Sequence, residues 1–289
     1  MQKAEEFQIK TEDRTLLSAT LYTKDRPAPH IIIMCPAAGA PQYYYQSFAQ
    51  YAADYKDFDV VTFDYRGIGK SQKHMQSKEP STMSDWGEQD LNAVIRWAGK
   101  HYDKVCLLGH SVAGQIFPKA ERNDRILAAY LVGSQSAYFG YWKGFWWLYV
   151  LIFWQFLIPV TTFLFGYLPG WTMGGKVALG KQVAREWRKW GTHPGGVLQD
   201  NPEIIRKFEA VKIHMHFVSI DDDKLLAPSS ATQALMHHYK NAITSFQFIR
   251  PKDLNLNKIG HFGFFKKKFA KQLWPMPMFY FSQFVNKLE

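Results

Sequence analysis

The sequence predicts an α/β fold, a mostly parallel, doubly wound sheet with an inserted apolar helical cap. Two observations predict it. Short, continuous apolar runs alternate with helical stretches, as expected of parallel strands that are buried on both faces. Between residues 138 and 202 this alternation stops and a long apolar segment takes its place. A chain of 289 residues accommodates one such domain with an insertion.

The individual elements follow from the hydrophobic pattern. Alternating residues on either side of Glu12-Asp13-Arg14 predict an N-terminal hairpin over residues 7–23. After it, strands and helices are expected in turn. Strands are predicted at residues 30–34, 58–63, 105–108, 126–132, 217–220 and 246–249, and helices at residues 43–55, 85–98, from 115 onward, 229–239 and at the C-terminus.

The segment after the third of these strands carries the strongest functional signal. Apolar residues 105–108 run directly into Gly109-His110-Ser111-Val112-Ala113-Gly114. A strand that enters a sharp turn with a central serine is typical of a nucleophile elbow, in which the hydroxyl projects above the sheet. The usual second glycine is replaced by Ala113, which is small enough for the close packing of strand and helix. The alternative is an ordinary turn in which Ser111 caps a helix.

Partners for this serine follow in the order serine, acid, histidine. An apolar strand pattern ends in Asp221-Asp222-Asp223, and His261 lies in a glycine-flanked loop before the last helix. A serine needs a base to take its proton, and the base needs a carboxylate to fix its tautomer. We predict Ser111, Asp222 and His261 as the catalytic residues, with Asp223 as the alternative acid. A merely solvated acidic turn remains the competing interpretation of the three aspartates.

With these motifs and Asp64-Tyr65-Arg66-Gly67-Ile68-Gly69-Lys70-Ser71, the chain resembles the α/β hydrolase superfamily over nearly its whole length. Within it, the chain is similar to bacterial predicted α/β hydrolases near the serine aminopeptidase (S33-like) and monoacylglycerol-lipase-like enzymes. Many relatives carry His-Gly at the start of the oxyanion loop, whereas this chain has Cys35-Pro36-Ala37-Ala38-Gly39. By position, the resemblance implies backbone N–H donors at Ala38 and Val112, with the neighbours of Ala38 as alternatives to it.

The apolar insertion separates the chain into two core parts, residues 1–137 and 203–289, and a cap at residues 138–202. Residues 147–168 are long and apolar enough for a membrane span. A span would place Ser111 and His261 on opposite sides of the membrane, so a lid over the site is the preferred interpretation. We expect Trp146, Trp147 and Phe153 to bind substrate. A lid that dips into the lipid interface remains an alternative.

The composition limits the classes of partner that we expect the protein to bind. The net charge of +10 favours anionic surfaces, but no nucleic-acid-binding motif accompanies it, so peripheral contact with an anionic membrane is the better interpretation. Cys35 and Cys106 lie in strand patterns and are expected to be buried. We expect no metal and no cofactor. The N-terminal residues lack the apolar stretch of a signal peptide, which predicts a cytoplasmic location. The sequence does not indicate the oligomeric state.

The expected function is therefore hydrolysis of a carboxylic ester with a hydrophobic acyl group, a small-molecule substrate. Thioester, peptide or acyl-transfer chemistry on the same triad remains open, as does a non-catalytic lipid-binding module. Two further interpretations concern residues near the site. His110 is expected to pack in the wall of the site, and Asp64 and Arg66 are expected to form an ion pair that fixes their loop.

Overall fold

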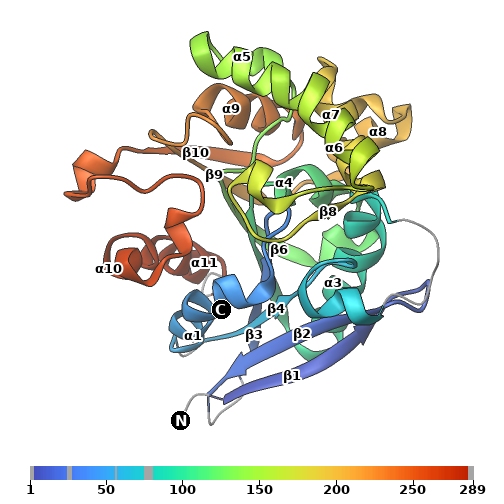
Figure 1. Ribbon diagram of the computed structural model, residues 1–289. Helices are drawn as coiled ribbons and strands as arrows, with labels where there is room; N and C mark the ends of the chain where they lie inside the picture. Colours follow the sequence, from blue (N-terminus) through green and yellow to red (C-terminus); the bar gives the residue numbers. More distant parts are fainter. Residues whose placement is uncertain (1–2, 25–27, 56, 75–80, 286–289) are drawn as a thin grey trace.

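A computed structural model describes residues 3–24, 28–55, 57–74 and 81–285 (Figure 1). Its centre is an eight-stranded sheet in the order β1-β2-β4-β3-β5-β6-β9-β10. The strands are β1 (Lys3–Lys10), β2 (Leu16–Thr23), β3 (His30–Cys35), β4 (Phe58–Phe63), β5 (Lys104–His110), β6 (Ile126–Val132), β9 (His214–Ile220) and β10 (Ile243–Ile249).

The sheet is mostly parallel. β1 pairs antiparallel with β2 and β2 antiparallel with β4, and every other neighbouring pair is parallel. Successive side chains point to opposite faces. In β3, for example, Ile31 and Ile33 join one apolar cluster, whereas Ile32 and Met34 join the other. Burial on both faces explains the continuous apolar runs, and the structure confirms the predicted fold class.

Helices cover both faces. The helices of the body are α1 (Gln46–Ala53), α2 (Met83–Asp85), α3 (Asn92–His101), α4 (Ala113–Ile116), α8 (Pro202–Ala210), α9 (Ser229–His238), α10 (Ala270–Leu273) and α11 (Pro275–Val285). Apolar residues of α1, α10 and α11 belong to one core cluster, and those of α3, α4, α8 and α9 belong to the other. Figure 1 shows these two groups on opposite sides of the sheet.

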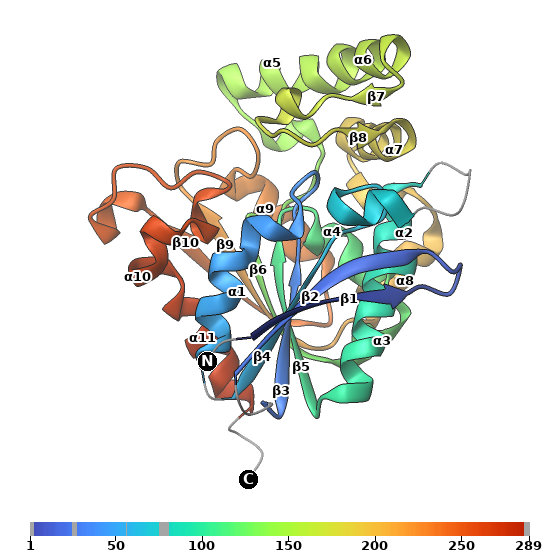
Figure 2. The same ribbon diagram turned by 60° about the horizontal axis from the view of Figure 1, so that its bottom comes forward.

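The remaining helices lie above one end of the sheet, as Figure 2 shows. They are α5 (Gly144–Ile152), α6 (Ile158–Leu164) and α7 (Lys181–Thr192), with the short strands β7 (Tyr167–Leu168) and β8 (Leu179–Gly180) between α6 and α7. A π-helical turn at Phe153–Leu157 joins α5 to α6, so that residues 144–164 form one helix. By length and composition alone, this helix is the one in the described chain that could cross a membrane.

Two local expectations differ from the structure. The helix predicted from residue 115 is only the short α4, followed by a 3-10 turn at Phe117–Lys119. Pro118 has no backbone N–H and cannot continue the α-helical ladder. The predicted pair of Asp64 and Arg66 is also wrong. Asp64 instead accepts hydrogen bonds from the backbone N–H groups of Gln42 and Lys70.

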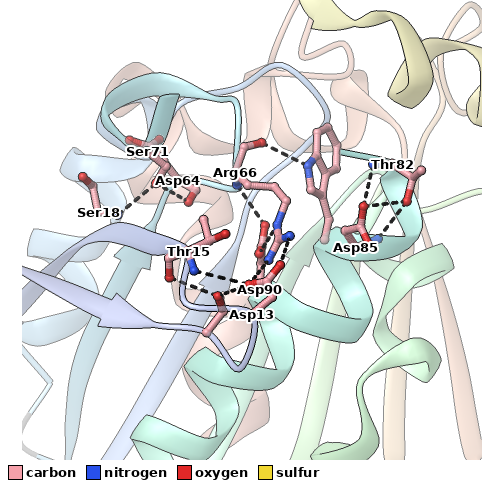
Figure 3. A network of polar contacts seen from close by, with 11 residues as sticks. Asp13, Thr15, Ser18, Asp64, Arg66, Ser71, Thr82, Asp85 and Asp90 are labelled. Atoms are coloured by element: carbon pink, nitrogen blue, oxygen red, sulfur yellow. Dashed lines mark hydrogen bonds and ion pairs between the residues drawn. The ribbon is translucent and has the colours of Figure 1, made fainter. Parts of the chain in front are cut away.

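Arg66 pairs with two other acids, and Figure 3 shows this network. Its Nε lies 2.7 Å from Oδ1 of Asp90, a fully buried carboxylate, and its Nη1 lies 2.5 Å from Oδ2 of Asp13 in the hairpin turn. Its backbone N–H also donates to Asp90. A buried guanidinium needs such partners, because an unpaired charge would be costly to desolvate. The network ties the N-terminal hairpin to the loop that follows β4.

Candidate active site

Ser111 stands at the turn between β5 and α4. Its φ is +57°, a left-handed value that is shared by only two other non-glycine residues in the described part of the chain. Such a conformation costs about 1–2 kcal/mol and persists only where the surroundings impose it. Here the backbone N–H of Ser111 donates to the carbonyl of Val132 at 2.9 Å. The serine is therefore held at the end of β5, in the conformation of a nucleophile elbow.

The turn is also fixed by close packing. A Cβ added to Gly109 would lie 2.6 Å from Cδ2 of Leu131 and 2.8 Å from Cβ of Ala113. The side chain of Ala113, which stands where a glycine is usual, thus occupies space left free by Gly109. A Cβ on Gly114 would similarly lie 2.8 Å from Cβ of Ser134. The departure from the usual glycine pattern is accommodated within the turn itself.

The three adjacent acids after β9 have three different partners. Asp221 forms an ion pair with Lys224 at 2.8 Å. Both oxygens of Asp222 accept backbone N–H groups of the histidine loop, from Ile259 and Gly260, each at 2.8 Å. Oδ2 of Asp223 lies 2.6 Å from Nδ1 of His261.

The carboxylate that orients His261 is therefore Asp223, and the preference for Asp222 is corrected. β9 ends at Ile220, and the backbone N–H of Asp223 donates to the carbonyl of Ile220, which turns the chain back on itself. This turn directs the third acid inward, so that Asp223 is only 4% exposed. Its other oxygen, Oδ1, accepts from the N–H groups of Leu226 and Ala227. Asp222 fixes the loop that carries His261, but contacts its backbone rather than its ring.

A second buried histidine links two loops of the site. The backbone N–H of Ala37 donates to the Tyr45 hydroxyl at 2.9 Å, and this hydroxyl lies 2.8 Å from Nδ1 of His110. Nε2 of His110 lies 3.1 Å from the carbonyl oxygen of His261. Because an amide N–H can only donate and a carbonyl can only accept, the chain of bonds runs in one direction. Tyr45 donates to Nδ1, and His110 donates through Nε2–H.

This arrangement requires a neutral His110. Complete burial, and then the nearby His261, hold the pKa of His110 well below its usual value of 6.5. Burial also raises the pKa of the Tyr45 hydroxyl well above its ordinary value, so the phenol keeps its proton. We call the chain Ala37–Tyr45–His110–His261 carbonyl the buried relay. It joins the loop after β3 to the loop that carries His261.

A cavity of about 550 Å³ lies between these loops and the cap. Its floor includes Ala38, Ser111, Asp223 and His261. Its roof is aromatic and comes from the cap. The aromatic lining residues of the cap are Trp142, Trp146, Tyr149, Phe153, Trp154, Trp171 and Trp187. An apolar cavity with a few polar groups at one end is the usual form of a small-molecule site.

The cavity distinguishes among the predicted binding residues. Trp146 and Phe153 line it, whereas Trp147 does not. One helical step of about 100° turns Trp147 away from the cavity, and its ring instead packs 6.1 Å from Phe139. Ala38 lines the cavity beside Ser111. The N–H of Ala37 is already used by Tyr45, which favours Ala38 over Ala37 as an oxyanion donor. Val112 is buried and directly follows Ser111.

Tyr45, Trp171 and Trp187 are among the residues of the site that were not predicted to be part of it. Tyr45 lies in a 3-10 turn far from His110 in sequence, and nothing in its local pattern indicates the contact. Trp171 and Trp187 line the cavity from outside the apolar helix. The signal for Trp187 was available, because it lies on the apolar side of the basic helix α7. Only the position of that helix over the cavity, which the sequence does not indicate, gives Trp187 its place in the site.

Comparisons with solved structures find the same fold. Est1E from Butyrivibrio proteoclasticus with bound ferulic acid aligns with a TM-score of 0.63 at 14% identity, covering 97% of this chain and 100% of that one. DcsB in complex with a substrate analogue aligns with a TM-score of 0.67 at 14% identity, covering 98% of this chain and 100% of that one. An esterase from Exiguobacterium antarcticum aligns with a TM-score of 0.63 at 15% identity, covering 96% of this chain and 100% of that one. At these identities the likeness concerns the fold.

The sequence comparison identifies the family. The comparison with curated proteins finds no match. The sequence model of the alpha/beta hydrolase family matches residues 32–254, a range that contains Ser111 and Asp223 and ends before His261. The match covers most of the chain, and the strand order and the serine turn agree with it. The chain therefore belongs to the alpha/beta hydrolase family.

Proposed function

We propose that the protein is a serine hydrolase that cleaves carboxylic esters with a hydrophobic acyl group. The observation that carries the proposal is the buried pair of His261 and Asp223, at 2.6 Å, in the wall of the cavity that also contains the strained Ser111. Asp223 accepts from Nδ1 of His261, which leaves Nε2 unprotonated and free to act as a base. Ser111, His261 and Asp223 all line the same largely apolar cavity, which supports the proposal.

The reaction proceeds in two halves. Ser111 Oγ bonds to the ester carbonyl carbon, its proton passes to Nε2 of His261, and the carbonyl electron pair moves to oxygen. The N–H groups of Ala38 and Val112 stabilise this oxyanion. The intermediate then collapses, the bond to the alcohol oxygen breaks, and His261 protonates the leaving alcohol. Water, activated by the same histidine, releases the acid from the acyl-enzyme and regenerates Ser111.

The aromatic roof supports a hydrophobic acyl group. Among the described residues, the lining contains no carboxylate apart from Asp222 and Asp223, and the cap side of the cavity is formed largely by Trp, Tyr and Phe. Burial of a methylene contributes about 0.8 kcal/mol. We therefore expect kcat/KM to rise about fourfold with each added methylene until the chain fills the cavity.

The test is hydrolysis of p-nitrophenyl esters from acetate to laurate by the wild type and by Ser111→Ala. Ser134→Ala is the matched control, because Ser134 is also a buried serine but lies outside the cavity lining. We expect turnover and fluorophosphonate labelling in the wild type and the control, and neither in Ser111→Ala. Labelling of Ser111 without turnover of any ester would contradict the substrate class. Turnover that persists in Ser111→Ala would contradict the mechanism.

A further inference from the structure

The helix over residues 144–164 has one face that no other part of the described chain covers. It contains no charged residue. Phe145, Leu148, Ile152, Phe156 and Phe163 recur at intervals of three, four or seven residues and are between 47% and 82% exposed. Residues at such intervals share one side of a helix. We call these five residues the outer cap face.

The exposed apolar residues of the molecule gather on the cap. Of the eighteen large hydrophobic residues exposed in the described part of the chain, thirteen lie between Phe145 and Trp171. Scattered exposed apolar residues are normal, but a contiguous group of this kind marks an interaction surface. Figure 2 shows α5 and α6 as the outermost layer above the body, so the outer cap face is accessible to a large partner.

The opposite side of the same helix packs against the rest of the protein. Phe153 and Trp154 are buried and line the cavity. Just before the helix, the indole N–H of Trp142 donates to the carbonyl of Leu225 at 2.8 Å, and within it the carbonyl of Trp154 accepts from Arg188 at 2.7 Å. A helix held in this way cannot cross a bilayer without losing the roof of the cavity. It can lie flat in the interface with its outer face buried.

The charge around the cap favours an anionic surface. Between Asp124 and Glu186 the sequence contains no acidic residue. Lys143, directly before α5, and Lys176, before β8, are exposed. Lys258, also exposed, lines the cavity together with residues of the cap. Exposed lysines beside an apolar, aromatic surface are the pattern that binds anionic headgroups while rings enter the interface.

A second copy of the chain fits this surface poorly, because two copies with a net charge of +10 would bring like charges together. A protein partner would be expected to form about one hydrogen bond per 100–200 Å² of interface. The five side chains of the outer cap face have no hydrogen-bonding group to offer. We propose that the outer cap face docks on the surface of an anionic lipid bilayer, with the helix in the plane of the interface.

The docking surface adjoins the cavity. Trp146, Tyr149 and Trp171 are each more than a third exposed and also line the cavity. Docking would therefore bring the cavity mouth to the lipid surface, so that an apolar molecule could enter without crossing water. The docking itself does not depend on ester hydrolysis, and its test uses no turnover.

The experiment is co-sedimentation of the full chain with vesicles of phosphatidylcholine alone or with about one third phosphatidylglycerol. All proteins carry Ser111→Ala, so that lipid hydrolysis plays no part. We expect binding to the anionic vesicles, weakened several-fold in about 1 M salt, where the Debye length is near 3 Å. Phe145→Ser combined with Phe163→Ser should lower the partition coefficient at least tenfold, because both rings would lose their place in the interface.

Phe279→Ser is the matched control. Phe279 is 69% exposed, close to the 71% of Phe145, but lies on α11 in the body. The Phe279→Ser variant should bind the anionic vesicles as tightly as the parent protein does. Unchanged circular dichroism and unfolding midpoint would show that the double variant is folded. The proposal is overturned if the parent sediments with neither vesicle, if the double variant binds as tightly as the control, or if light scattering shows a dimer that the double variant abolishes.

Discussion

Removal of the Tyr45 hydroxyl tests whether the buried relay holds the two loops of the site together. Tyr45→Phe keeps the ring, which packs edge-on against Phe265 at 5.0 Å, and deletes only the oxygen. That oxygen accepts from Ala37 at 2.9 Å and donates to His110 at 2.8 Å. The substitution therefore leaves one donor and one acceptor unpaired, both in residues that are at most 2% exposed.

The expected magnitude follows from these two groups. A buried polar group without a partner costs about 1–3 kcal/mol, so the free energy of unfolding should fall by about 2–6 kcal/mol. The same change releases the loop after β3 from the loop of His261. Since displacement of reacting groups by about 1 Å can cost a hundredfold in rate, we expect kcat to fall by about 10- to 100-fold. KM should change little, because Tyr45 does not line the cavity.

The assay combines urea unfolding with ester kinetics. Tyr102→Phe is the control, because the Tyr102 hydroxyl also bonds a buried partner, Asp59 at 2.9 Å, but lies at the opposite end of β5 from Ser111. It should lower the stability without lowering kcat. If Tyr45→Phe unfolds at the wild-type midpoint, or loses stability with unchanged kcat, the relay does not position the site.

Three further predictions concern single positions. Asp223→Asn should lower kcat by about 10⁴-fold, as loss of the orienting acid does in other triads, whereas Asp222→Asn should lower it about tenfold or less; equal losses in steady-state assays would refute the assignment. His110 has a depressed pKa, so below pH 6.5 the unfolded chain binds a proton that the folded one does not. His110 should then contribute a loss of about 1.4 kcal/mol for each pH unit below 6.5, until the pH reaches its folded pKa, and His110→Gln should reduce the slope of stability against pH by this amount in urea titrations at several pH values. Gly109→Ala should destabilise the protein by about 1–3 kcal/mol through overpacking, and a thermal midpoint equal to that of the wild type would show that the turn has more room than its contacts indicate.

The sequence predicted the sheet well because each buried strand carries its own signal. Ser111 and His261 could be predicted as candidates because both lie in short glycine-containing segments at the ends of elements. The sequence could not indicate whether Asp222 or Asp223 contacts the ring of His261, because this depends on how the turn after Ile220 closes against the histidine loop. The sequence also could not indicate which side of the cap helix faces the cavity, for a different reason. Both of its faces are apolar, so no periodicity separates Trp146 from Trp147.

The position of the cap in the chain has a consequence for how the molecule can change. β6 and β9 are parallel neighbours in the sheet, and α8, which leads into β9, packs on the body. β6, α8 and β9 follow the order of a strand–helix–strand crossover, and the cap is inserted between β6 and α8. The inserted segment is anchored to the body, because Glu186 of α7 accepts hydrogen bonds from Ser84 and Asp200 pairs with the buried Lys119. A cap of another length or lining would therefore have to keep these two anchors.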